Sequence, residues 1–276
     1  RAYSQMFKLT PDIILECQML LDYIGVPYLK SPEEADSQCA FMSKDCNNKV
    51  WGVVSEDTDP LVFGAPYLLV NFKKKSIIEQ YSLSDILENL GISYEHFVDV
   101  CILSSTDYCP SIKNMNSSTG YNAIVEILKN EHKYEIDTNA DIPGMKILRK
   151  KLQTTEFLHK IWPNLIKKQT DKYYLEMLVN DSRFNLMFKL VNKIYKENGY
   201  KNTEHSKYCI PDNFLWSYIL AKQYYINNAK IRTENEDQPL HNFDLLKQPH
   251  EDNIYQLLVK WSGFKPGYVN NFIRNV

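Results

Sequence analysis

A short apolar run, Val50–Val54, is followed within five residues by two aspartates, Asp57 and Asp59. A second acidic pair, Glu34 and Asp36, precedes the run. Because β-branched runs of this length are typical of buried strands, we expect Asp57 and Asp59 at the carboxyl end of a strand. Ligands of open α/β sheets collect at that end of the strands. The pattern therefore predicts an α/β layer with acidic side chains at one edge of its sheet.

The first acidic pair lies where a helix is expected to begin. Ser31 is a good N-cap and Pro32 suits the first helical position, so the first turn would hold both Glu34 and Asp36. A structural explanation fits equally well for Glu34, because Ser31-x-x-Glu34 forms a capping box and acids in a first turn complement the helix dipole.

The second pair has a structural alternative too, since two aspartates before Pro60 also suit a turn. All four carboxylates at one sheet edge would repel one another, however. A hard divalent cation with oxygen ligands is the usual remedy for such a cluster. The combination therefore favours a metal site.

Helical and strand patterns alternate through the first hundred residues, as in a parallel α/β sheet. We expect helices over residues 10–24, ending at Gly25, from Ser82 to near Gly91, and from Ser93 to Leu103. Strands are expected over Val26–Leu29 and Tyr67–Phe72.

Charge and cysteine content bound the class of protein. The 276 residues carry 32 basic and 34 acidic side chains, so a nucleic-acid surface must come from local patches. The six cysteines show no CxxC pairing, which favours a reducing, intracellular compartment without structural zinc. No apolar run approaches the length of a membrane span and no signal peptide is evident, so we expect no membrane partner.

Three successive motifs carry a family resemblance: GVPYLKSPEEADSQCA, VVSEDTDPLVFGAPYLL and FVDVCILSSTDYCPSI. In this order they resemble the internal nuclease region of the flap endonuclease and XPG superfamily of structure-specific 5′ nucleases. We expect a divergent member, with a virus as one candidate source. Residues 214–231 and the terminal segment EDNIYQLLVKWSGFKPGYVNNFI resemble its helical end more loosely. The resemblance implies an α/β fold, a PIN-like core with a mostly parallel sheet flanked by helices, a helix-two-turn-helix and a helical C-terminal extension. It implies a nuclease core over residues 1–128, and a helical insertion with the rest of the core over 129–276.

The resemblance also implies the site. Glu34 and Asp36 match the family's P-x-E-A-E/D motif, Asp57 and Asp59 match E-D-x-D, and Asp107 matches the aspartate of G-x-D-Y. In the family these acids are catalytic and hold two Mg²⁺ ions, with Mn²⁺ as a substitute. Two such ions activate the attacking water and neutralise charge on the leaving oxygen.

A loop that grips duplex DNA in the family is glycine-rich, whereas this chain has Lys113, Asn114, Asn116 and Ser117 there. Asparagine tolerates positive φ best among the other residues, so Asn114 and Asn116 are expected to keep the backbone path, with all four residues binding DNA. Ser105 also replaces a family glycine. Further basic runs, each more often a solvated face, are Lys73–Lys75, Arg149–Lys151 and Lys167–Lys168.

The expected function is Mg²⁺-dependent cleavage of branched or flapped DNA in replication, repair or recombination, in the nucleus or at a viral replication site, alongside replication or repair proteins. The alternatives are a catalytically silent DNA-binding scaffold and an RNA-directed nuclease of the same superfamily. The five matched acids argue against the scaffold. The resemblance also implies that further metal-binding aspartates and a mobile arch precede Arg1, so we expect residues 1–276 alone to be incomplete and nearly inactive.

Overall fold

The computed structural model describes residues 9–31, 33–44, 50–72, 77–130, 133–134, 142–152, 171–199, 202–231 and 248–275. The chain forms two compact units. The first comprises Arg1–Ala35 and Asn235–Val276, and the second comprises Asp36–Glu234. The domain division at residue 128 stays a prediction.

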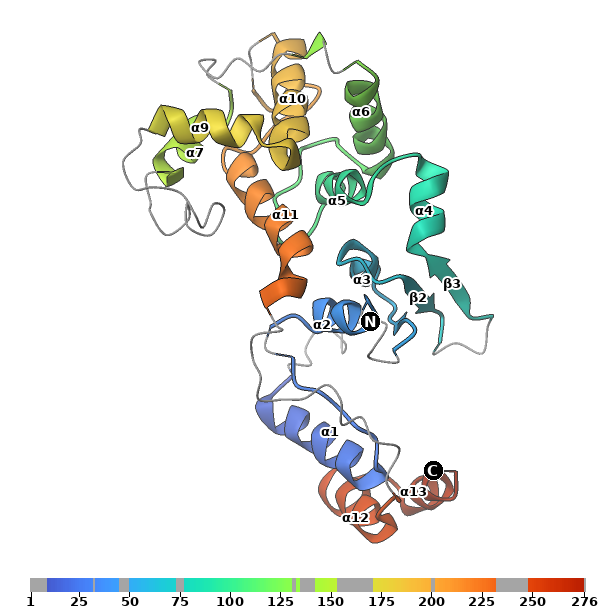
Figure 1. The fold of residues 1–276 in the computed structure, drawn as a ribbon. Helices are drawn as coiled ribbons and strands as arrows, with labels where there is room; N and C mark the ends of the chain where they lie inside the picture. Colours follow the sequence, from blue (N-terminus) through green and yellow to red (C-terminus); the bar gives the residue numbers. More distant parts are fainter. Residues whose placement is uncertain are drawn as a thin grey trace. The chain divides into compact units, whose positions relative to one another are not determined.

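Helices from both ends of the chain build the first unit (Figure 1). The expected helix over residues 10–24 is confirmed, because the Thr10 hydroxyl accepts from the Ile13 amide and Gly25 ends the helix in the left-handed conformation. The helix packs against a second one from the chain end, where the His250 amide donates to the Tyr23 carbonyl at 2.7 Å. The elements are α1 (Pro11–Ile24), α12 (Glu251–Tyr255), the π-helical η5 (Gln256–Trp261) and α13 (Pro266–Ile273).

Two expectations near the boundary between the units are wrong. Val26–Leu29 is not a strand, because the described part of the first unit contains only helices and offers it no partner. The next helix, α2 (Ala35–Lys44), begins four residues after Ser31. Its start is late because the Ser31 hydroxyl donates to the Glu34 carbonyl at 3.0 Å, whereas an N-cap hydroxyl accepts from a helical amide.

A small mixed sheet opens the second unit. β1 (Val53–Val54) pairs with β2 (Tyr67–Val70) in parallel, and β2 pairs with β3 (Glu79–Ser82) in antiparallel. Both expected strands are therefore shorter than their apolar runs, and β2 ends before Asn71, whose φ is 62°. The α/β class is confirmed, but only one of the two described pairings is parallel, because β3 forms where no strand was expected.

Helices dominate the rest of the second unit. Ser82 and Ser93 cap two of them as expected, each hydroxyl accepting from the amide three residues later. An amphipathic pattern around Phe184–Ile194 also forms a helix. The helices are α3 (Asp59–Val62), α4 (Leu83–Leu90), α5 (Tyr94–Leu103), α6 (Ser117–Lys129), α7 (Met145–Leu152), α9 (Asp171–Asn180), α10 (Ser182–Glu197) and α11 (Phe214–Ile231).

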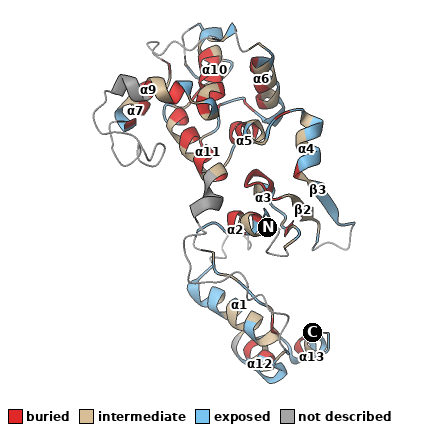
Figure 2. Ribbon diagram, viewed as in Figure 1, coloured by how far each residue is buried: buried red, intermediate tan, exposed pale blue. Residues whose placement is uncertain are grey.

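The core of this unit lies between α5, α6, α10 and α11, whose buried faces meet (Figure 2). Ile102, Ile124, Leu190 and Leu215 are at most 1% exposed. Each such side chain contributes about 1.5–3 kcal/mol on burial, so this layer holds α5 and α11 firmly together. In the described ranges, no helix is both long and apolar enough to cross a bilayer.

Candidate active site

Asp57 and Asp59 follow β1 in one tight turn of the second unit. The Ser55 hydroxyl accepts from the Asp57 amide at 3.0 Å, and the Asp57 Oδ1 accepts from the Asp59 amide at 3.2 Å. Asp59 is then the first residue of α3, with Pro60 behind it. The sequence folds this way because the strand run ends at Val54 and the aspartates supply turn hydrogen bonds.

This turn borders an open hollow of about 690 Å³, lined by Val54, Ser55, Glu56, Asp57, Thr58 and Phe72. Ser55 is half-buried, while Glu56 and Asp57 are exposed. Asp57 is therefore accessible to a solute, whereas Asp59 is half-buried.

Asp107 lies in the turn after α5. An isolated bridge between Thr106 and Cys109 closes this turn, which leaves Asp107 exposed. Ser105, just before it, has φ 97°, a conformation that glycine adopts without strain. Ser105 is therefore in a strained backbone conformation, which lets the chain turn sharply out of α5.

The remaining two acids flank the start of α2. Asp36 is in the first turn of α2 and belongs to the second unit. Glu34 precedes the helix and belongs to the first unit, so only Asp36 of this pair lies in a helical turn as expected. Burial raises the pKa of the Cys39 thiol, and the charge of Asp36 one turn earlier adds to the rise.

The pKa values of two side chains, Cys101 and Tyr225, respond to the charge of Asp59. Burial raises the pKa of Cys101 on α5 to about 12, and the charge of Asp59 contributes. Tyr225 on α11 is 1% exposed, and burial followed by the charges of Asp59 and Asp107 raises the pKa of its hydroxyl. Within the described residues, no group of three or more His, Cys, Asp or Glu side chains is close enough to hold a metal ion.

Tyr225 touches both acidic segments through its ring. The ring centroid is 4.8 Å from that of Phe63, at the end of α3, and 5.4 Å from that of Tyr108, beside Asp107. Tyr224 contacts the same two rings at 5.6 and 4.7 Å. The end of α11 is therefore packed between the segments that carry Asp59 and Asp107.

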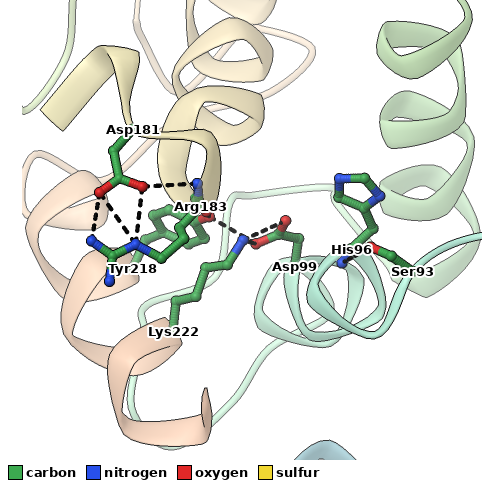
Figure 3. A network of polar contacts seen from close by, with 7 residues as sticks. All are labelled: Ser93, His96, Asp99, Asp181, Arg183, Tyr218 and Lys222. Carbon is green, nitrogen blue, oxygen red and sulfur yellow. Dashed lines mark hydrogen bonds and ion pairs between the residues drawn. The ribbon is translucent and has the colours of Figure 1, made fainter. Parts of the chain in front are cut away.

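One turn earlier, α11 is fixed to α5 by a buried polar network (Figure 3). The ammonium of Lys222 donates to both Asp99 oxygens at 2.7 and 2.8 Å, and the Tyr218 hydroxyl donates to Asp99 Oδ1 at 2.7 Å. Burial raises the pKa of the Asp99 carboxyl, while Lys222 and Tyr218 act in the opposite direction. Beside it, Arg183 pairs with Asp181 at the start of α10.

The loop between α5 and α6 holds the predicted DNA-binding residues. Asn114 has φ 64°, which confirms that asparagine adopts a positive φ here. The same expectation for Asn116 is wrong: its φ is −123°, because its side chain accepts from the Thr119 amide as the N-cap of α6. Ser117 is the first residue of α6 and is exposed, as Lys113 is.

A second loop, residues 202–210, supports this one, and sequence reasoning missed it. The Lys113 ammonium donates to the Glu204 carbonyl at 3.2 Å, and the Asn114 amide donates to the Lys207 carbonyl at 3.0 Å. Lys207 is exposed and lies over the Tyr208 ring. The exposed lysine pair Lys113 and Lys207 therefore comes from distant parts of the sequence.

Of the other basic runs, Arg149–Lys151 forms the last turn of α7, where Lys151 lies over the Trp216 ring. Lys73–Lys75 and Lys167–Lys168 lie outside the described residues.

Comparison with known families and proteins agrees with the motifs. Residues 25–107 match the family described as the XPG I-region. Flap endonuclease 1 of Mus musculus is 38% identical over 125 residues, which cover 44% of this chain and 32% of the mouse protein. Flap endonuclease 1 of Homo sapiens is 36% identical over 148 residues, 49% of this chain and 38% of the human protein. The chain thus spans about a third of the length of the curated relatives it matches.

Solved structures share the fold. Flap endonuclease-1 of Methanococcus jannaschii gives a TM-score of 0.57 at 21% identity, over 96% of this chain and 57% of the other. The catalytic core of Rad2 in complex with DNA substrate gives 0.56 at 21% identity, over 96% and 67%. Human GEN1 in complex with Holliday junction DNA gives 0.52 at 17% identity, over 94% and 50%.

Proposed function

Since this chain belongs to the flap endonuclease and XPG superfamily, we propose that it serves as a Mg²⁺-dependent nuclease that hydrolyses phosphodiester bonds in branched or flapped DNA. The observation that carries the proposal is the turn after β1. It presents Asp57 at an open hollow with Asp59 two residues later, while Tyr225 packs against the segments that carry Asp59 and Asp107.

The donor set fits hard divalent cations. Asp36, Asp57, Asp59 and Asp107 offer carboxylate oxygens, the ligands that Mg²⁺ prefers, and Glu34 would add a fifth carboxylate. The buried hydroxyls of Thr106 and Tyr225, which have no hydrogen-bond partner in the described structure, provide donors beside them. When bound, two such cations supply an activated water and neutralise charge on the leaving oxygen, and Mn²⁺ is expected to substitute for Mg²⁺.

The chain's own residues orient the reaction. The Ser55 hydroxyl and the Asp57 carboxylate fix the turn by accepting amide hydrogen bonds, which orients the Asp57 carboxylate without a ligand. The rings of Phe63, Tyr108 and Tyr225 exclude water behind the acids, which strengthens electrostatic interactions at the front.

Duplex DNA is proposed to bind at the loop between α5 and α6. The exposed ammonium of Lys113 and the neighbouring Lys207 supply positive charge there, and the first turn of α6 supplies amides, with Asn114, Asn116 and Ser117 at the same edge. Replication or repair proteins as partners, and a location with DNA in the nucleus or at a viral replication site, follow as parts of the same proposal.

The direct test is cleavage of end-labelled substrates by the purified complete protein, including any sequence that flanks residues 1–276, with Mg²⁺, with Mn²⁺ and with EDTA. Flap DNA, a four-way junction, plain duplex and single-stranded RNA of matched length should be compared. We expect metal-dependent cleavage of the branched DNA, lost in Asp57→Ala. Metal-dependent cleavage of RNA alone would replace the DNA assignment, and binding of flap DNA without cleavage by any preparation would favour a scaffold.

A further inference from the structure

Tyr225 is buried between the two acidic segments of the second unit. It is 1% exposed, and its ring packs against Phe63 and Tyr108 on opposite segments. The ring alone would explain its burial, because phenylalanine makes the same contacts. Its hydroxyl is what needs an explanation.

Neither that hydroxyl nor the buried Thr106 Oγ1 has a hydrogen-bond partner of good geometry among the described residues, although Thr106 lies close enough to lower the pKa of Tyr225 as a weak donor. Buried polar groups in folded proteins are nearly always paired, and an unpaired one costs free energy. The Tyr225 O–H, which has no acceptor among the described residues, is therefore expected to gain one that arrives with a ligand.

The surroundings identify the kind of ligand. Tyr225 packs between the segments that carry Asp59 and Asp107, and a tyrosine hydroxyl is an uncharged proton donor at neutral pH. A neutral donor beside carboxylates suits a carboxylate oxygen or a cation-bound water, and it does not replace a carboxylate as ligand.

We propose that Tyr225 is a positioning residue of the acidic site, assisted by Thr106: its hydroxyl donates a hydrogen bond into the site when a hydrated divalent cation is bound, and so raises the affinity for that cation. The inference rests on the proposed function for the cation itself. It assigns the end of α11 a role beyond packing.

The test is isosteric removal of the hydroxyl. Mn²⁺ affinity is measured from the electron paramagnetic resonance signal of free Mn²⁺ with wild-type protein, Tyr225→Phe and Thr106→Val, without DNA. We expect about tenfold weaker Mn²⁺ binding in Tyr225→Phe and a weakening in the same direction in Thr106→Val. The thermal midpoint of cation-free Tyr225→Phe should equal or exceed that of the wild type, because the change removes an unpaired buried hydroxyl.

Tyr224→Phe is the matched control, since Tyr224 contacts the same two rings and should keep Mn²⁺ affinity within about twofold. A lower cation-free midpoint with unchanged Mn²⁺ affinity in Tyr225→Phe would mean a structural role and overturn the inference. Asp59→Asn separates the two proposals: if it abolishes Mn²⁺ binding while Tyr225→Phe leaves the affinity unchanged, the acidic site stands and the role of Tyr225 falls. Absence of Mn²⁺ binding by the wild type would overturn both.

Discussion

Two polar clusters lie one turn apart on α11, and their hydrogen bonding differs. Asp99, Lys222 and Tyr218 pair completely: the carboxylate accepts three hydrogen bonds of 2.7–2.8 Å at 2% exposure or less. The hydroxyls of Tyr225 and Thr106 are also buried, but neither has a hydrogen bond of good geometry in the described structure, and Thr106 is at most a weak donor to Tyr225. Both clusters join α11 to α5 or its following turn. The complete one therefore acts as a structural lock, whereas the incomplete one lies where a ligand is expected.

An unpaired group is not by itself a marker of function. Both polar atoms of the Gln223 side chain, between the two clusters, also lack a partner in the described structure. What distinguishes Tyr225 is its position between the segments that carry Asp59 and Asp107. The two clusters therefore differ in whether a proposed site residue lies beside them.

Breaking the complete cluster should have the largest effect. Lys222→Met leaves the Asp99 carboxylate buried without its ammonium, so we expect the free energy of unfolding in urea to fall by about 3–5 kcal/mol. The double variant Asp99→Leu with Lys222→Met removes both charges and should recover most of the loss. A loss below about 1 kcal/mol in Lys222→Met would mean that the pair is not a lock.

Removing an acid of the proposed site, beside the incomplete cluster, should affect chemistry and leave stability intact. Asp57→Ala or Asp107→Ala is expected to slow cleavage of flap DNA by at least about a hundredfold, equivalent to about 2.7 kcal/mol, with DNA binding kept or tightened. The neighbouring exposed Glu56 provides the control, because Glu56→Ala should change the rate less than about threefold, or about 0.6 kcal/mol. Full turnover by Asp57→Ala would reject the assignment.

The sequence predicted features that depend on neighbouring residues, and it missed features that depend on contacts between distant residues. Local signals placed α1, α4 and α5, because caps such as Thr10, Ser93 and Gly25 act within one turn. They also placed Asp57 and Asp59 at the end of β1. The buried pair of Asp99 and Lys222 joins positions 123 residues apart, and no local pattern marks it. The late start of α2 and the antiparallel β3 likewise depend on contacts that periodicity does not encode.

The departures from the family pattern were more informative than the matches. Asn114 takes the positive φ that a glycine would, whereas Asn116 is used as a cap. Ser105 keeps a φ of 97° despite its side chain. A single sequence shows which residue differs, but only the fold shows whether the backbone path was retained.

The backbone strain at Ser105 can be tested directly, because Ser105 lies in the turn that carries Thr106. Ser105→Gly should raise the free energy of unfolding by about 1 kcal/mol, because glycine adopts a positive φ without strain. The greater flexibility of glycine in the unfolded chain offsets part of this gain. Ser104→Gly is the control and should lower stability, because Ser104 has φ −75° and its hydroxyl donates to the Val100 carbonyl. Equal losses in both variants would contradict strain at Ser105.

Exposed cations should behave unlike the locked Lys222. The Lys113 ammonium is exposed and donates only to a backbone carbonyl in the described structure, a bond that phosphate can replace. Lys113→Ala should weaken duplex binding for all sequences and lower the slope of log affinity against log salt by about 1. Lys150→Ala, on α7, is the control. An unchanged slope in Lys113→Ala would remove the loop from the DNA interface.

The smallest effect is expected at an exposed ion pair. Lys193 pairs with Glu126 at 2.5 Å and with Glu197 at 3.5 Å, and the Glu126 side chain is 48% exposed. The hydrogen bond from Lys193 lowers the pKa of Glu126, so its stabilisation is present above the unfolded value near 4.5 and is lost as the pH falls through the folded value. Glu126→Gln should therefore cost less than about 1 kcal/mol at pH 7, because solvent screens the pair, Glu197 still partners Lys193, and glutamine can still accept from the Tyr134 hydroxyl. Urea unfolding at pH 7 and below pH 4.5 checks both parts, since the difference from the wild type should shrink in acid. If Glu126→Gln lowered the free energy of unfolding as much as Lys222→Met does, the two ion pairs would contribute equally and their difference in burial would not matter.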